Sequence, residues 1–199
     1  MDDETALRDA WEHGRFDEAT TLALERYGPE ILGLLAARLR SDGDAAEAFS
    51  IFAEDLWRGL PGFAWRCSLR AWAHRVARNA ANRWAVAGAR RAALNQPVPG
   101  EVIEAVADRV KTTTLVYLKS EVKSEIRRLR DELPAEDQLV LVLRVDKDME
   151  WRDIAMALAD ADLDEAAVVR EAARLRKRLQ LATARLRELA TARGLLAPG

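Results

Sequence analysis

The sequence predicts an all-α fold made of two small helical domains. No segment alternates apolar and polar residues over a strand's length, and the β-branched and aromatic clusters that signal a sheet are missing. Glycine and proline interrupt the chain at Gly28-Pro29, Gly43, Gly59 to Gly62, Pro97 to Gly100 and Pro134, leaving stretches of helical length. With 199 residues, 49% hydrophobic and 32% charged, the chain has the balance of a soluble globular protein.

The strongest interruption runs from Asn95 to Gly100, where two prolines lie among few apolar residues. Such composition is typical of an interdomain connection. We therefore expect a first domain over residues 1–91, a flexible linker over 92–112 and a second domain over 113–199.

In the first domain, apolar residues recur at helical spacing. They are Leu22, Ile31, Leu34, Leu35, Leu39, Ala45, Ala48, Phe49, Phe52 and Leu56. The best-defined helix follows Ser68, a residue suited to capping a helix N-terminus. Its expected core stripe is Leu69, Trp72, Ala73, Val76, Ala77, Ala80 and Trp84. Its expected basic face is Arg70, His74, Arg75, Arg78, Asn79, Asn82 and Arg83.

The second domain also reads as helical. One stripe is expected over Leu115, Leu118, Val122, Ile126, Leu129 and Leu133. Pro134, followed by Glu136 and Asp137, suits the start of the next helix, because anions stabilise the positive end of its dipole. A short helix around Trp151 and a last helix from about Asp164 then form a helix-turn-helix pattern with a basic second helix.

Charge alternates along the chain although the net charge is only −2. Residues 1–55 carry 14 acids and 5 bases, and residues 56–100 carry 8 bases and no acid. Residues 101–169 carry 17 acids and 10 bases, and residues 170–199 carry 8 bases and 2 acids. Because charges are screened over roughly 8 to 10 Å at cellular salt, the local sign matters more than the total. Two basic blocks favour a polyanion bound at two places over two merely solvated helix faces.

Aromatic residues concentrate in the first basic block. Phe63, Trp65, Trp72 and Trp84 lie in its acid-free sequence. Cations interleaved with aromatic rings are typical of single-stranded nucleic acid sites, where rings stack on unpaired bases. The alternative is that Trp72 and Trp84 belong to the core. Arginines on one helix face with no carboxylate neighbour repel one another unless a polyanion relieves them, which favours a binding role.

The basic last helix suits duplex DNA, because the second helix of such a pair enters the major groove. A membrane surface is a weaker alternative, since the apolar side of this helix lacks an aromatic anchor.

Catalysis has little support, and no catalytic residue is assigned: there is no glycine-rich phosphate loop or credible nucleophile set. One cysteine, Cys67, and two histidines exclude a disulfide and a zinc cluster, so neither metal nor cofactor is expected. No membrane-spanning or signal segment is found, which predicts a cytoplasmic protein.

The run from Ser68 to Asn79, S-L-R-A-W-A-H-R-V-A-R-N, is similar to the S-L-R-A-W-L-x-x-I-A-R-N signature of sigma-70 family sigma factors. Leu133 to Gln138 and Trp151 to Ala155 look like the family's L-P-x-x-x-R and Y-x-E-I-A segments. Lys177 to Arg187 resembles its recognition helix. The chain departs from the family at 159–173, where a tight turn is usual. The resemblance is to the short extracytoplasmic-function (ECF) type, which keeps only regions 2 and 4.

The resemblance implies a non-catalytic protein that directs core RNA polymerase to promoters. Region 2 would capture unpaired bases of the −10 element and open the DNA, and region 4 would read the duplex −35 element. The implied −10 residues are Trp65, Arg70, His74, Arg75, Arg78, Asn79, Asn82 and Arg83. The implied −35 residues are Arg170, Arg174, Arg176, Lys177, Arg178 and Arg185.

The acidic segment upstream of the signature resembles the part of region 2 that docks on the clamp helices of core polymerase. The implied docking residues are Asp44, Glu47, Ser50, Glu54, Asp55 and Trp57. The expected partners are core RNA polymerase and promoter DNA, with an anti-sigma factor as a further candidate and no membrane. The rival hypothesis is a stand-alone helix-turn-helix transcriptional regulator, which would bind promoter DNA without polymerase.

Overall fold

The computed structural model describes residues 3–86, 101–120, 125–159 and 163–196. Its regular secondary structure in these ranges is entirely helical, which confirms the predicted all-α class. The chain divides into two compact units, Met1–Ser120 (unit 1) and Glu121–Gly199 (unit 2).

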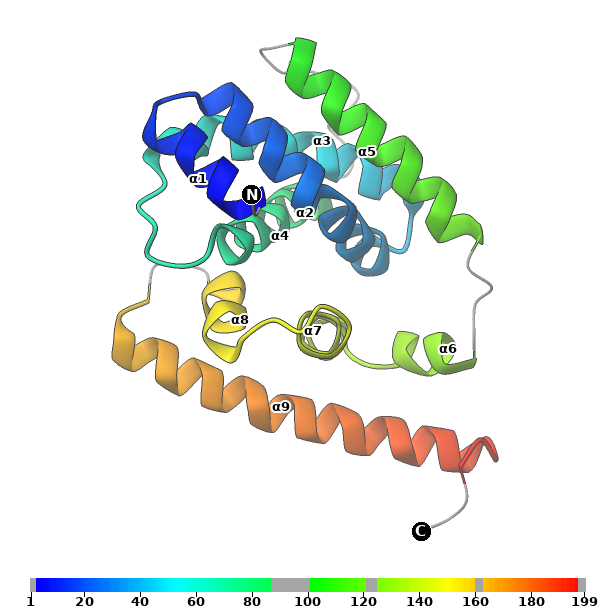
Figure 1. Ribbon diagram of the computed structural model, residues 1–199. Coiled ribbons are helices and arrows are strands. Elements are labelled where there is room, and N and C mark those ends of the chain that lie inside the picture. The colour runs from blue at the N-terminus through cyan, green and yellow to red at the C-terminus, as the bar shows by residue number, and fades with distance from the viewer. Residues whose placement is uncertain (1–2, 87–100, 121–124, 160–162, 197–199) are drawn as a thin grey trace. The chain divides into compact units, whose positions relative to one another are not determined.

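Unit 1 is built around its second helix. The elements are α1 (Asp3–Glu12), α2 (Phe16–Leu39), α3 (Asp42–Gly59), the short 3-10 turn η1 (Leu60–Gly62), α4 (Leu69–Val86) and α5 (Glu101–Ser120) (Figure 1). The helix α2 packs against α1, α3, α4 and α5. The candidate functional side chains of unit 1 lie mainly on α3 and α4, and both of these helices pack against α2.

The helix α2 continues through Gly28 and Pro29, where the sequence predicts an interruption. A proline inside a helix removes one backbone donor and crowds the preceding turn. Here Ile31, Leu32 and Leu35 beyond it are fully buried, so packing on the neighbouring helices keeps the helix intact. Local helix propensity is overridden by tertiary contacts.

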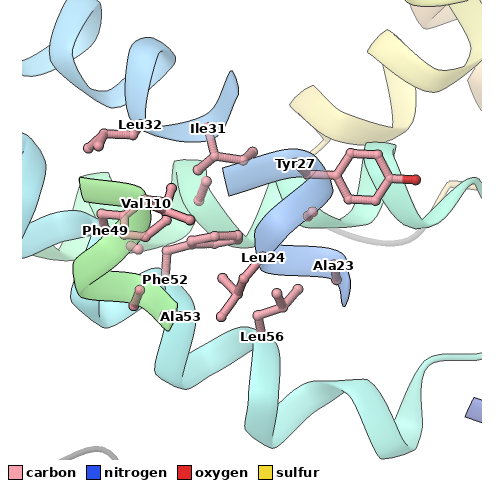
Figure 2. Packing of buried hydrophobic residues seen from close by; sticks show 14 of the residues in the cluster. Ala23, Leu24, Tyr27, Ile31, Leu32, Phe49, Phe52, Ala53, Leu56 and Val110 are labelled. Atoms are coloured by element: carbon pink, nitrogen blue, oxygen red, sulfur yellow. The ribbon is translucent and has the colours of Figure 1, made fainter. Parts of the chain in front are cut away.

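The core of unit 1 forms where α2 meets α3. Leu24 and Ile31 of α2 and Phe49, Phe52 and Leu56 of α3 are all fully buried. The Phe49 and Phe52 rings lie 5.4 Å apart between centroids. Figure 2 shows Phe52 and Leu56 beside Leu24, with Val110 of α5 beside Phe49. Side chains from three helices thus fill one core.

The expected linker differs from the structure over its second half. Residues 92–100 lie outside the described ranges, but residues 101–112 form most of α5. Ile103, Val106, Ala107 and Val110 recur at helical spacing and are buried in the unit 1 core. Residues 101–112 follow the prolines closely and were therefore expected to be linker, but their apolar face makes them a packed helix. Unit 1 consequently extends to Ser120.

Unit 2 consists of helices that pack along one long helix. They are α6 (Glu125–Asp131), α7 (Ala135–Leu141), the π-helical turn η3 (Val142–Asp146), α8 (Trp151–Leu158) and α9 (Glu165–Ala192) (Figure 1). The helices α6, α7 and α8 each contact α9. Of the stripe expected from Leu115 to Leu133, the first two residues lie in α5, Ile126 and Leu129 lie in α6, and Leu133 lies between α6 and α7. Val122 lies outside the described ranges.

Two helix starts in unit 2 are where the sequence predicts them. Pro134 precedes α7, with Glu136 and Asp137 in the first turn. Asp164 is the N-cap of α9, and its carboxylate accepts a hydrogen bond of 2.7 Å from the backbone N–H of Ala167. Such a cap satisfies one of the donors that a helix N-terminus leaves unpaired.

Candidate nucleic-acid interface

The first candidate surface lies on α4, whose start is fixed by Ser68. The Ser68 hydroxyl accepts a hydrogen bond of 3.1 Å from the backbone N–H of Ala71, which confirms the predicted cap. Ala73, Ala77 and Ala80 are fully buried. Alanine at these positions lets α4 lie close to its neighbours α2 and α3.

The exposed side of α4 carries part of the predicted basic face. Asn79, Asn82 and Arg83 are exposed, and Arg75 and Arg78 are half-buried. We call these five residues the α4 basic face. The Asn82 side-chain oxygen accepts a hydrogen bond of 2.7 Å from Arg38 at the end of α2. This arginine therefore joins the surface from a part of the sequence that pattern analysis did not select.

Two predicted members of that face, Arg70 and His74, lie instead on the packed side of α4. His74 is only 2% exposed, and its Nε2 lies 2.7 Å from Oε1 of Glu30 in α2. Arg70 donates to both Glu30 oxygens, at 2.9 and 3.0 Å. Ala71 and Ala81 are also buried, so the packed side of α4 is wider than predicted and includes Arg70 and His74. The predicted basic face was too wide by these two residues.

Glu30 is the residue of this cluster that pattern analysis missed. Burial raises the pKa of its carboxyl, but hydrogen bonds from His74 and Arg70 and their charges outweigh that effect and lower the pKa below 4.5. An acid within the apolar sequence from Tyr27 to Leu35 is the signal that could have identified it. Arg70, His74 and Glu30 connect α4 to α2, which is a structural role.

One of the remaining arginines of α4, Arg83, has a carboxylate neighbour, contrary to the sequence-based expectation. Arg83 pairs with Asp55 of α3. The indole Nε1 of Trp84 donates to Asp44 of the same helix at 3.0 Å. These partners lie about 30 to 40 residues away in sequence, so a search of the α4 sequence alone cannot find them. The acidic block of α3 thus partly neutralises the α4 basic face.

Trp65 lies in the segment before α4, packed among aromatic rings. Its ring centroid is 4.9 Å from that of Phe63 and 5.5 Å from that of Trp11, and the Arg8 guanidinium lies 4.8 Å from it. Its backbone φ is 53°, a left-handed conformation that is unusual for a bulky residue. Its Nε1 is buried and has no hydrogen-bond partner within the described ranges. In this conformation Trp11 and Arg8 of α1 and Phe63 pack against the half-buried ring.

The other tryptophans of unit 1 are half-buried against the core. Trp72 lies 5.0 Å from Phe63 between ring centroids, and Trp84 also packs on the core cluster. Trp57 donates from Nε1 to Asp17 of α2 at 2.7 Å. The core alternative therefore holds for Trp72 and Trp84.

The expected docking residues on α3 lie on one helix but make different contacts. Glu47 is exposed, whereas Glu54 is half-buried and pairs with Arg58 at 2.5 Å. The Ser50 hydroxyl donates to the carbonyl of Ala46 at 3.2 Å and accepts from Nζ of Lys111 in α5 at 3.0 Å. Asp44 and Asp55 are engaged by α4, as described above. The helix α3 is thus an acidic ridge with contacts to its neighbours in unit 1.

The second candidate surface lies on α9 in unit 2. Its predicted residues fall into two groups. Arg178 pairs with Glu136 at 2.6 Å and with Asp137, and Arg176 lies over the Trp151 ring at 5.5 Å. Both therefore attach α9 to other helices of the unit.

The second group of α9 residues faces solvent. Arg174 pairs with Glu171 at 2.6 Å, and Arg185 pairs with Glu188 at 3.1 Å, both along the helix itself. Arg170 and Lys177 are exposed and have no ion-pair partner in the described part of the chain. Among the predicted α9 residues, these two cations are the most available for an added anion.

The described ranges contain no group of three or more His, Cys, Asp or Glu residues placed to hold a metal ion. No helix in those ranges is long and apolar enough to span a bilayer.

Comparison with known families bears on unit 1. Residues 23–92 match the family model of Sigma-70 region 2. The region 2 match includes α3, η1 and α4, and therefore both the acidic ridge and the α4 basic face. It supports a sigma-70 family factor with a role in RNA polymerase binding and promoter melting. No curated protein and no solved structure matches the chain.

The Glu30 cluster leads to a prediction for stability. Because the pKa of Glu30 in the folded state is below 4.5, its stabilising effect is full above that value and is lost as pH falls through the lowered pKa. Glu30→Gln should destabilise unit 1 by roughly 1 to 3 kcal/mol near neutral pH, because the half-buried Arg70 guanidinium loses its counter-charge and the buried His74 ring loses a carboxylate partner. It should also reduce the loss of stability on acidification. Urea unfolding followed by circular dichroism at several pH values measures both effects.

Glu25→Gln is the matched control, since Glu25 is 49% exposed and pairs with Arg109 at the surface. We expect a change of less than about 1 kcal/mol from this substitution. Equal effects of the two substitutions would contradict a structural role for the buried cluster.

Proposed function

We propose that the protein is a sigma factor of the ECF type, which binds core RNA polymerase and directs it to a subset of promoters. The observation that carries the proposal is the region 2 match over residues 23–92. In this proposal the region 2 domain matched over residues 23–92 binds core polymerase and opens the −10 element, and unit 2 reads the −35 element. The protein acts in the cytoplasm and performs no catalysis of its own.

The α4 basic face supports the proposed DNA-opening role. Asn79, Asn82 and Arg83 are exposed along one side of the helix. Exposed cations follow a phosphate backbone, and amides can bond unpaired base edges. Arg70 and His74 are not among the proposed DNA contacts, because Glu30 holds both on the packed side of α4. Trp65 would contribute only after leaving its aromatic neighbours.

In unit 2, the helix pair α8 and α9 supports the proposed duplex-reading role. The helices contact each other, and the exposed cations Arg170, Arg174, Lys177 and Arg185 lie along α9. A basic helix that follows a short helix is the arrangement of a helix-turn-helix reader. Arg176 and Arg178 would position this helix, since both contact neighbouring elements of the unit.

Transcription in vitro tests the proposal directly. The purified chain, mixed with bacterial core polymerase and fragmented genomic DNA, should give transcripts with defined start sites, whereas core polymerase alone should not. Failure to bind core in a pull-down would contradict the proposal. A footprint on promoter DNA without polymerase would favour the stand-alone regulator instead.

Arg83→Ala should impair open-complex formation more than binding to core polymerase. Loss of a cation that follows the phosphate backbone of single-stranded DNA should weaken the open complex and reduce its salt dependence. Permanganate footprinting of unpaired thymines measures opening, and a pull-down measures core binding. Arg15→Ala is the control, because Arg15 is a similarly exposed arginine of unit 1 that pairs with surface carboxylates. Equal loss of opening and core binding in Arg83→Ala would show that the face is assigned incorrectly.

Substitutions of two adjacent cations of α9 should have different effects. Lys177→Ala should weaken binding of the holoenzyme to duplex promoters about uniformly across sequences and reduce the salt slope by about 1. Arg178→Ala should mainly destabilise unit 2, because Glu136 and Asp137 lose their partner. Binding titrations at several salt concentrations and thermal unfolding distinguish the two effects. A reduced salt slope with unchanged stability in Arg178→Ala would place that side chain at the DNA.

A further inference from the structure

The helix α5 is an addition to the matched region 2 domain. The match ends at residue 92, and α5 begins at Glu101, yet α5 packs against both α2 and α3. Its contact face is a narrow apolar stripe of Ile103, Val106, Ala107 and Val110, each at most 8% exposed. An amphipathic helix therefore covers a surface of the domain formed by α2 and α3.

The approach of α5 to α2 is close at one point. A Cβ atom at Gly28 would lie 2.9 Å from Cγ1 of Val110 and 3.3 Å from Cζ of Phe49. Real Cβ atoms do not come so near another carbon, so glycine at this position fits the docked α5. Figure 2 shows Val110 of α5 seated beside Phe49. Glycine is otherwise a poor residue for a helix interior, and this contact accounts for its presence in α2.

Polar contacts flank the apolar stripe of α5. Lys111, which pairs with Asp108 of α5 at 2.6 Å, also donates from Nζ to the Ser50 hydroxyl at 3.0 Å, and Arg109 pairs with Glu25 at 3.1 Å. The helix α5 is thus held by apolar burial and by two polar contacts, one to α2 and one to α3. The surface accepts an amphipathic helix with an apolar stripe and polar flanks. Ser50 is also a member of the proposed docking set, between Glu47 and Glu54 on α3.

We propose that α5 occupies part of the face on which core polymerase docks and must leave before core binds. The inference rests on the proposed function, because it concerns regulation of the same docking surface. A protein whose binding-competent state is populated only in part binds its partner correspondingly more weakly. The undocking equilibrium of α5 would therefore set the apparent affinity for polymerase.

A disulfide that locks α5 in place tests the inference. The 2.9 Å from a Gly28 Cβ to Cγ1 of Val110 is too short for two unbonded carbons, but it matches the separation between a Cβ and the far sulfur of a disulfide, so Gly28→Cys with Val110→Cys is a suitable pair. Cys67→Ser removes the only native thiol. In the full-length triple variant, the oxidised form should bind core polymerase at least about tenfold more weakly than the reduced form, since the lock removes the competent state. The two single-cysteine variants, each carrying Cys67→Ser, control for the oxidising conditions.

A second pair of variants loosens α5. Val110→Asp places a charge in the buried contact, whereas Thr112→Asp places the same charge on the exposed side of α5. The first should bind core polymerase several-fold more tightly than the second, and hydrogen exchange should show that α5 has left while α2 remains protected. This arm does not depend on disulfide geometry.

Three results would overturn the inference. The oxidised and reduced forms could bind core equally, the two cysteines could fail to join under mild oxidation, or Val110→Asp could release α5 without raising the affinity. If the unmodified chain and every variant fail to bind core, the proposed function itself is wrong, and the inference falls with it. The first three results leave the proposed function standing, so the two failures are distinguishable.

Discussion

Burial of α2 on several sides is the constraint on which unit 1 depends. The helix contacts α1, α3, α4 and α5, so it cannot end at Pro29 without removing Ile31, Leu32 and Leu35 from the core. The same helix supplies Glu30, which holds Arg70 and His74 of α4. It also supplies Gly28, which admits Val110 of α5. The direction of α4, and with it the basic face, follows from how α2 is packed.

In unit 1, basic side chains of one helix contact acidic side chains of another. The basic block of α4 and the acidic block of α3 are separate in sequence but meet through Arg83 with Asp55 and Trp84 with Asp44. A surface ion pair such as Arg83 with Asp55 contributes little to stability, and it exchanges partners at small cost. A phosphate backbone can therefore replace a carboxylate beside Arg83. The half-buried Glu30 cluster differs, because removal of Glu30 leaves the Arg70 guanidinium without its carboxylate.

The sequence predicted those parts of the fold that depend on local chemistry. The all-α class, the caps at Ser68 and Asp164 and the helix start after Pro134 follow from short-range rules for apolar spacing and helix ends. The signature between Ser68 and Asn79 led to the same domain that the family match supports over residues 23–92.

The features that sequence patterns did not predict depend on packing between helices that are distant in sequence. Continuation of α2 through Pro29 and the docking of residues 101–112 in α5 depend on surfaces supplied by other helices. The placement of Arg70 and His74 depends on Glu30, which is about 40 residues away. Alanine gives a weak periodic signal, so the packed side of α4 was drawn too narrowly and its basic face too widely. The carboxylate partners of α4 were missed because they belong to α3.

Trp151 offers a way to observe unit 2 in isolation. Two guanidinium groups lie over its ring, from Arg144 in η3 and from Arg176 on α9, each 5.5 Å from the ring centroid. The other five of the six tryptophans belong to residues 1–120. With those five replaced by phenylalanine, the indole emission would come only from the junction of η3, α8 and α9. The fluorescence of Trp151 would therefore report on the contact between α8 and α9, the second candidate DNA-binding helix.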